Sequence, residues 1–406
     1  MTNATPANVL RADATLPAMV IKASRLRNNL EVMADYVRER GCFLAPHGKT
    51  TMAPGLFRRQ LEHGAWGITV GSVTQARVAM TAAPERILIA NEVVGGADIA
   101  QLADWAERAD LRGADLRAGP EVRCLVDSVA GVRLLEEGLA AAGAPARVPV
   151  LLEIGVAGGR TGVRNRAEAR AVVAAVSASD HVALTGVEGY EGGIGSDRDP
   201  GTLARVDRYL EEVRDVTLEL AAAGAFSDRW SVVLTAGGSK YFDRVAAAFG
   251  EDVLPMHPRP DVVIRAGAYI THDHGIYAQV SPLAPGRGPG RSLLPALEVW
   301  GDVLSVPEPS RAIVGVGRRD VPYDLSLPIP LRVAGRGGRA GPAPAGLAVT
   351  ALDDQHCYLD MAAGRVQVGD RVGFGISHPC TAFDKWREVA IVDEDYNVVD
   401  TVSTYF

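Results

Sequence analysis

Lysine is scarce in this chain of 406 residues. Among its 42 basic residues, the lysines are only Lys22, Lys49, Lys240 and Lys385. A guanidinium stays protonated at any working pH and cannot form a Schiff base, whereas a lysine amine that loses its proton can attack an aldehyde. Because arginine supplies most of the positive charge, a lysine here is a candidate for amine chemistry.

Long apolar runs and clusters of basic residues are also absent. No stretch of 18 uninterrupted apolar residues occurs, and residues 1–20 lack the apolar region of a signal peptide, so a cytoplasmic protein without membrane insertion is expected. The formal net charge is −7 and no long run of Lys or Arg is present, which argues against nucleic acid as a partner. The expected partner is a small molecule.

Cysteine is rare, and the four cysteines are widely spaced. Cys42, Cys124, Cys357 and Cys380 are far apart and form no CxxC pair. In a reducing compartment this pattern indicates core thiols or a metal ligand rather than disulfides.

The apolar pattern predicts an α/β fold. Eight short apolar runs alternate with longer amphipathic stretches, which is typical of βαβ units in a parallel sheet. Their number and spacing favour a (β/α)₈ barrel of the TIM type, which needs about 250 residues, over residues 20–280. The runs are 42–45, 67–70, 87–90, 122–126, 148–154, 183–187, 231–234 and 262–266.

The remaining chain differs in its hydrophobic pattern and composition. Residues 281–406 contain alternating patterns and Pro- and Gly-rich stretches, which predict a C-terminal all-β domain. Residues 1–19 are expected to pack on that domain. The low-complexity stretch 335–346 is expected to be a disordered loop rather than a binding motif.

Polar residues follow the predicted strands, at the barrel end where such folds carry their chemistry. Lys49 lies in the motif APHGKT directly after the first strand, which makes it the first catalytic candidate, although a solvated lysine in a loop fits the motif about as well. The full set is His47, Lys49, Asn91, Asp127, Arg160, Tyr190, Thr235, Ser239, Tyr269 and Asp273.

A Gly-rich segment follows the seventh predicted strand. In Thr235-Ala236-Gly237-Gly238-Ser239, the backbone N–H groups and two hydroxyls suit a phosphate at a helix N-terminus, and barrels favour phosphate sites after strands seven and eight. A plain Gly-rich turn is the alternative. A phosphate site together with a candidate Schiff-base lysine indicates pyridoxal 5′-phosphate (PLP).

A metal site is also indicated. His378 and Cys380 are two residues apart, so an extended segment places both side chains on one face. His272 and His274 have the same spacing and form a rival pair, although they follow a barrel strand and fit a hydrogen-bonding pair beside the phosphate equally well. An imidazole with a thiolate favours Zn²⁺ over harder ions, and His356 or Asp384 remain open as a further ligand.

Collinear segments resemble the D-serine dehydratase and D-threonine aldolase family of alanine-racemase-like, fold-type III PLP enzymes, nearest its amino acid deaminase branch. PHGKTTMAPGLFRRQLEHGAWGITVGSVTQA resembles the Schiff-base region, GGRTGV and GYEGG two strand-end motifs, and TAGGS the phosphate loop. RAGAYITHD, DDQHCYL and ISHPCTAFDKWRE resemble later motifs, the last with the family's metal pair. The match covers nearly the whole chain.

The resemblance implies residue roles. Lys49 corresponds to the Schiff-base lysine, and His378 with Cys380 to the catalytic metal ligands. The cofactor-binding set would be His47, Lys49, Arg160, Tyr190, Thr235, Gly237, Gly238, Ser239, Tyr269 and Asp273, with Arg160 at the ring hydroxyl. Ala45 and Thr51 stand where many relatives have Arg and His. The substrate side chain therefore does not carry over from the family.

The implied activity is a PLP- and metal-dependent dehydratase of D-3-hydroxy amino acids that yields a 2-oxo acid and ammonia. Freed Lys49 would remove the α-proton and the metal would polarise the β-hydroxyl. Three alternatives stay open: a D-threonine-type aldolase, an amino acid racemase and a noncatalytic PLP-binding protein. A homodimer is implied by the resemblance alone.

Overall fold

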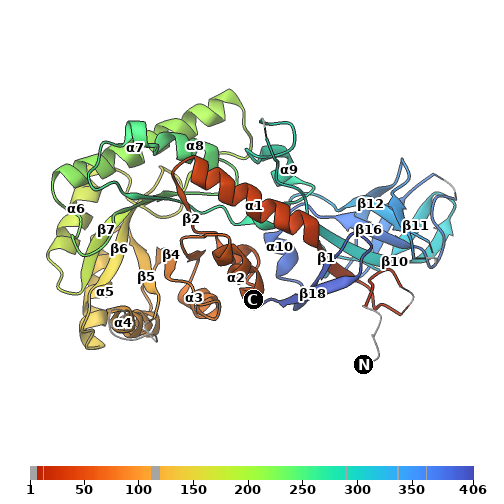
Figure 1. Ribbon diagram of the computed structural model, residues 1–406, viewed down its shortest axis with the longest axis horizontal. Coiled ribbons are helices and arrows are strands. Elements are labelled where there is room, and N and C mark those ends of the chain that lie inside the picture. The colour runs from red at the N-terminus through yellow and green to blue at the C-terminus, as the bar shows by residue number, and fades with distance from the viewer. Residues whose placement is uncertain (1–6, 12, 111–118, 289, 336–337, 363) are drawn as a thin grey trace. The chain divides into compact units, whose positions relative to one another are not determined.

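The computed structural model describes residues 7–11, 13–110, 119–288, 290–335, 338–362 and 364–406. The chain forms two compact units. The barrel unit comprises Met33–Lys49 and Phe57–Gly267, and the β unit comprises Met1–Val32, Thr50–Leu56 and Ala268–Phe406. Both are drawn in Figure 1.

Eight parallel strands build the barrel unit, which confirms the predicted fold class. Their hydrogen-bonded order is β2-β9-β8-β7-β6-β5-β4-β3. Main-chain bonds from Trp66 N to Leu44 O (2.7 Å) and from Thr69 N to Pro46 O (2.9 Å) join the two ends of this path. The strands are β2 Phe43–Leu44, β3 Ile68–Val70, β4 Arg86–Glu92, β5 Glu121–Val126, β6 Val148–Ile154, β7 Val182–Gly189, β8 Val233–Ala236 and β9 Asp261–Ile264.

Helices follow these strands and flank the sheet in Figure 1. Local sequence starts several of them, because Ser72, Ser128 and Asn165 each accept a hydrogen bond from the first helical turn. The helices are α1 Ala23–Glu39, α2 Pro54–Glu62, α3 Val73–Met80, α4 Gly96–Asp110, α5 Val129–Ala141, α6 Arg166–Ser177, α7 Pro200–Ala222 and α8 Phe242–Ala248. Among the described residues, none of the helices is long and apolar enough to cross a membrane.

Apolar side chains from the strands and the segments beside them fill the barrel interior. Burying one such side chain fully stabilises the fold by about 1.5–3 kcal/mol. The barrel is therefore a packed core rather than a channel. This cluster comprises Ala45, Trp66, Leu88, Leu125, Leu151, Val233 and Val263.

The β unit contains a sheet whose main path runs β13-β12-β16-β10-β1-β17-β18. The strand β1 lies inside this path, antiparallel to β10 and parallel to β17. Its strands are β1 Ala18–Lys22, β10 Leu297–Glu308, β11 Arg311–Val314, β12 Ile329–Ala334, β13 Ala340–Pro342, β14 Ala348–Leu352, β15 Cys357–Asp360, β16 Arg371–Gly375, β17 Glu388–Val392 and β18 Val398–Ser403, with short helices α9 Ile276–Val280 and α10 Cys380–Phe383.

The expectation of a disordered loop at 335–346 is wrong for part of that stretch. Ala340–Pro342 forms β13, which pairs antiparallel with Arg332–Ala334 of β12. This pairing supplies backbone hydrogen bonds that cannot be predicted from the Gly-rich composition of the stretch. Residues 336 and 337 lie outside the described residues.

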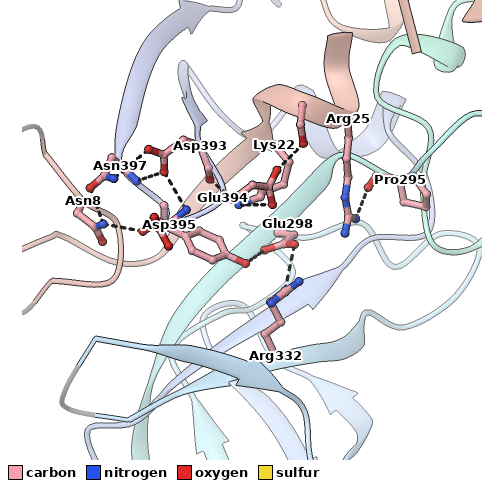
Figure 2. A network of polar contacts seen from close by, with 12 residues as sticks. Asn8, Lys22, Arg25, Pro295, Glu298, Arg332, Asp393, Glu394, Asp395 and Asn397 are labelled. Carbon is pink, nitrogen blue, oxygen red and sulfur yellow. Dashed lines mark hydrogen bonds and ion pairs between the residues drawn. The ribbon is translucent and has the colours of Figure 1, made fainter. Parts of the chain in front are cut away.

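A polar network ties β1 to the C-terminal part of the β unit (Figure 2). The Lys22 side chain is 2% exposed and donates a 2.5 Å hydrogen bond to the Asp393 carbonyl. Its ammonium also lies 3.9 Å from the centre of the Tyr396 ring and 3.6 Å from a Glu394 carboxylate oxygen. Burial lowers the pKa of Lys22, although the carboxylates of Glu394 and Glu298 favour its charged form. Lys22 is thus a structural lysine.

Candidate active site

A cavity of about 280 Å³ opens at the C-terminal ends of the barrel strands. This volume lies near the lower end of the ~300–1,000 Å³ typical of ligand pockets. Seven of the eight strands contribute to its wall, within or just after the strand. The lining residues are His47, Lys49, Gly71, Ala90, Asn91, Arg160, Thr161, Glu188, Tyr190, Gly237 and Arg265.

Lys49 is the one lysine in this wall, and it lies in a single 3₁₀ turn, η1 Gly48–Thr50, directly after β2. Gly48 allows the turn to pack closely, since a Cβ there would come within 2.8 Å of the Phe57 ring and 3.2 Å of Ile68. Lys49 is solvent-exposed. An amine held at the cavity wall by a rigid turn is accessible to a carbonyl compound.

The other lysines do not line this cavity. Lys240 donates a 3.1 Å hydrogen bond to the Gly195 carbonyl, and Lys385 lies 3.9 Å from an Asp384 carboxylate oxygen. With Lys22 buried in the β unit, Lys49 is the lysine at the cavity wall.

His47 is held neutral beside Lys49. Burial and the charges of Lys49, Arg265 and Arg160 lower its pKa well below the usual value. Its Nδ1 is buried and has no hydrogen-bond partner among the described residues. A neutral imidazole with one nitrogen unpartnered is suited to contact a bound aromatic ring or polar group.

The sequence did not predict Arg265 and Glu188, which form a buried ion pair at the cavity. Each side chain is 2% exposed. Arg265 Nη1 also donates to Thr235 Oγ1 (2.8 Å) and Nη2 to the Gly189 carbonyl (3.0 Å). Burial raises the pKa of Glu188 to about 7 despite the neighbouring guanidinium. The pair fixes a positive group in the cavity wall.

The Gly-rich segment after β8 is placed as expected, but some of its polar groups are engaged. Gly237 lines the cavity, and a Cβ there would lie 2.8 Å from the Arg265 backbone nitrogen. Gly238 N donates to Glu191 Oε1 (2.9 Å). The Thr235 hydroxyl donates to the Val263 carbonyl (2.7 Å) and accepts from Arg265, so it contributes to the barrel wall rather than presenting a donor to the cavity.

Arg160 and Tyr190 lie together at the rim. The Arg160 guanidinium carbon is 4.5 Å from the centre of the Tyr190 ring, a cation–π distance. Two strand ends predicted separately, those of β6 and β7, therefore supply one contact pair.

Three carboxylates lie close together next to this rim. Ligand oxygens of Glu92, Asp127 and Glu153 lie within 4.8 Å of one another. Burial and the neighbouring Glu153 carboxylate raise the pKa of Glu92 to about 9, so Glu92 carries a proton at neutral pH. Sharing a proton relieves the repulsion between buried acids.

Tyr269 and Asp273, predicted at the end of the last barrel strand, belong to the β unit. Asp273 is buried and its carboxylate accepts hydrogen bonds from Gly275 N (2.8 Å) and Tyr277 N (3.0 Å), at the start of α9. Burial raises its pKa to about 7. Their predicted roles in cofactor binding stay predictions.

The predicted metal pair lies where β16 leads into α10. His378 Nδ1 is 2.6 Å from Asp324 Oδ2, and Thr381 Oγ1 donates to the other Asp324 oxygen (2.8 Å). Burial lowers the pKa of His378, but hydrogen bonds to Cys380 and Asp324 outweigh it and raise the pKa to about 9. Cys380 lies 3.5 Å from Thr50 Oγ1. A nitrogen and a sulfur with a supporting carboxylate suit a zinc ion.

The rival pair is arranged differently. His272 and His274 are both neutral, with pKa values lowered by burial to about 4 and about 3. His274 packs against the position where a Gly375 Cβ would lie, 2.5 Å away. Asp384, one of two residues left open as a further ligand, caps α10, whereas His356 lies in the turn between β14 and β15.

Family models match two parts of the chain. The alanine racemase N-terminal domain matches residues 21–246, more than half of the chain. The putative serine dehydratase domain matches residues 296–392.

Relatives match most or all of the chain. A D-threonine aldolase from Arthrobacter sp. is 26% identical over 353 residues, which is 86% of this chain and 80% of that protein. The crystal structure of D-threonine aldolase from Filomicrobium marinum has a TM-score of 0.81 at 23% identity and covers 100% of this chain and 98% of its own. D-threo-3-hydroxyaspartate dehydratase from Delftia sp. HT23 has a TM-score of 0.75 at 21% identity, with coverage of 98% and 99%.

The family match, the barrel and the lysine at the ends of its strands agree with one another. The chain belongs to the alanine-racemase-like family of fold-type III PLP proteins and carries a putative serine dehydratase domain.

Proposed function

We propose that the protein is a PLP- and metal-dependent lyase that removes water from D-3-hydroxy amino acids and yields a 2-oxo acid and ammonia. One observation carries this proposal: Lys49 is the single lysine lining the cavity at the strand ends, and it lies beside a neutral imidazole and two arginines. An amine, a planar neutral ring and fixed positive charge are what an anionic aldehyde cofactor needs.

The residues of the cavity fit PLP. His47 Nδ1, Glu188 Oε2 and Arg265 Nε are buried without hydrogen-bond partners among the described residues, so a ligand can satisfy them. Gly237 lets the segment after β8 lie close to the Arg265 backbone, because a Cβ there would be 2.8 Å from the Arg265 nitrogen. Lys49 would hold the aldehyde carbon and Arg160 the ring hydroxyl, while the segment after β8 would face the phosphate.

When bound, PLP supplies an electron sink for charge that develops at the substrate α-carbon. The Lys49 amine then takes the α-proton, and Arg265 keeps a positive charge in the cavity wall. The hydroxyl leaves as water, and the released enamine takes up water to give the 2-oxo acid and ammonia. The proton that Lys49 takes from the α-carbon would leave with the hydroxyl as water, and the enamine is then hydrolysed by one water molecule, so no oxidant is required.

His378 and Cys380 would hold the metal ion, which supplies a Lewis acid for the β-hydroxyl. Asp324 orients the His378 ring through Nδ1, so Nε2 is the nitrogen left for a metal. The mixed nitrogen and sulfur donor set favours Zn²⁺.

Retro-aldol cleavage to glycine and an aldehyde is the second candidate. It is favoured by the curated relative that matches 86% of this chain, which is described as a D-threonine aldolase. In this reaction the site would remove the proton of the β-hydroxyl, and the Cα–Cβ bond would break instead of the bond to the hydroxyl. The Cys380 thiol supports elimination instead. A soft sulfur ligand suits zinc, and zinc would act as the Lewis acid on the leaving hydroxyl.

A substrate panel separates these reactions. Purified protein would be incubated with D-serine, D-threonine and D-3-hydroxyaspartate, with and without a chelator, and ammonia, 2-oxo acid and aldehyde would be assayed. Ammonia without aldehyde, lost on chelation, supports elimination. Aldehyde with glycine establishes the aldolase, and no turnover of any of the three substrates rejects both.

A further inference from the structure

Arg160 is carried by a loop that is folded back on itself. The loop, residues 155–163 and here called the Arg160 loop, leaves β6 and returns to it, because Gly155 N donates to the Val163 carbonyl and Val163 N to the Glu153 carbonyl, both at 2.9 Å. Two side chains anchor its far end: the Thr161 hydroxyl donates to Glu153 Oε1 (2.8 Å), and Gly162 N to Asp127 Oδ2 (3.0 Å).

The carbonyls of this loop converge on one guanidinium, that of Arg164. Its Nη1 donates to the Thr161 and Gly162 carbonyls, each at 2.5 Å. Its Nη2 donates to the Gly159 carbonyl (3.2 Å) and to the carbonyl of Arg160 itself (2.8 Å). Turn carbonyls have no strand partner, so a side chain with several fixed donors is the group that can satisfy four of them at once.

Glycine makes room for this arrangement. A Cβ at Gly155 would lie 1.8 Å from Arg164 Nη1, and a Cβ at Gly162 would lie 2.4 Å from the Gly155 nitrogen. Gly162 also has φ +94, a conformation that L side chains rarely adopt. The backbone of Arg164 is fixed in turn, since its N–H donates to Glu168 in the first turn of α6 (2.7 Å). The guanidinium is therefore held in place before any ligand arrives.

We infer that Arg164 is a positioning residue for PLP binding, acting by fixing the loop that presents Arg160 and Thr161 to the cavity. The inference rests on the proposed function for the identity of the ligand. Arg164 itself does not line the cavity, whereas Arg160 and Thr161 do. Its effect on the cofactor must therefore pass through the loop.

Lysine cannot replace Arg164 in this role. An ammonium is a single point donor group, whereas the two Nη groups reach separate pairs of carbonyls. Arg164→Lys keeps the charge and so separates charge from geometry. Arg166, two residues on, is the matched control, because its guanidinium pairs with Glu219 on a neighbouring helix rather than with the loop.

Two measurements test the inference. The first is amide hydrogen exchange of the peptide covering residues 155–164 in PLP-free protein. Arg164→Ala and Arg164→Lys should accelerate exchange about tenfold or more, since loss of these bonds promotes local opening, while Arg166→Ala should leave it unchanged. Unchanged exchange in Arg164→Ala would overturn the inference.

The second is the dissociation constant for PLP, titrated into PLP-free protein and followed by absorbance. Arg164→Ala should raise it roughly tenfold to a hundredfold, because small misplacements of positioning groups cost that much. In an Arg160→Ala background the same substitution should have a much smaller effect, because Thr161 is then the only one of the two lining residues left for the loop to present. An equal effect in both backgrounds would show that Arg164 acts on general stability and would overturn the inference.

If the wild-type protein binds no PLP, the proposed function fails and the ligand role fails with it, while the exchange rates report separately whether Arg164 holds the loop.

Discussion

Replacing Glu191 by Gln should stabilise the protein above neutral pH. Glu191 is fully buried after β7, and its Oε1 accepts the Gly238 N–H. A Gln side chain has the same shape and keeps that acceptor. The substitution therefore removes a buried charge without removing its hydrogen bond.

The size of the effect follows from the pKa of Glu191, which burial raises to about 7 from a usual value of 4.5. A carboxyl with a raised pKa binds its proton more tightly in the folded state, so the wild-type protein loses stability as pH rises from 4.5 to 7 and no further beyond. At 1.36 kcal/mol per pKa unit the loss is about 3 kcal/mol. Glu191→Gln should not suffer this loss.

Urea unfolding at pH 5 and pH 8, followed by tryptophan fluorescence, measures the difference. The free energy of unfolding of Glu191→Gln should exceed that of the wild type by about 3 kcal/mol at pH 8. At pH 5 the difference should be only a fraction of this value. The exposed Glu251, whose side chain is 80% accessible, provides the control variant Glu251→Gln, which should change stability by less than about 0.5 kcal/mol at both pH values. If Glu191→Gln were no more stable than the wild type at pH 8, the argument from burial would be refuted.

Three further predictions concern the site. Lys49→Arg should abolish both the imine absorption near the visible edge and turnover, because a guanidinium forms no Schiff base; an absorption spectrum after PLP addition checks this, and persistence of the band would reject Lys49 as the binding residue. Gly237→Ala should weaken PLP binding at least tenfold, since its Cβ would lie 2.8 Å from the Arg265 nitrogen; a PLP titration that matches wild type would show that the loop adapts. Asp324→Asn should lower zinc affinity about 10- to 100-fold by releasing the His378 ring, measured by competition with a chromogenic chelator, with the exposed Asp354→Asn as a control; equal affinities would remove Asp324 from the metal site.

The barrel could be predicted because its strands are buried on both sides and read as short apolar runs between turn residues. All eight runs correspond to strands, and Lys49 and Arg160, which were predicted because they come after strands at the end where barrels bind ligands, line the cavity. Position after a strand was the useful signal.

The sequence failed where a strand boundary was wrong by one or two residues. Glu188 lies in β7 one residue beyond the predicted end, and Arg265 follows β9, whose predicted end was too late. Arg265 fell inside the predicted run 262–266, and Glu188 was not among the polar residues selected after the run 183–187, so the buried ion pair was missed. Asp324 was missed for another reason: it lies 54 residues from His378 in sequence, and no periodic pattern connects such residues.

Because β1 pairs with both β10 and β17, the β unit is assembled from segments that lie far apart in the sequence. Val20 lies beside Glu298 on one side and beside Ala390 on the other. A ribosome-bound chain that has completed the barrel strands still lacks both neighbours of β1, and that strand keeps an unpaired edge until β17 has been synthesised. Nascent chains should therefore depend on chaperones that cover this strand, and deletion of residues 18–22 should leave β10 and β17 without their shared partner.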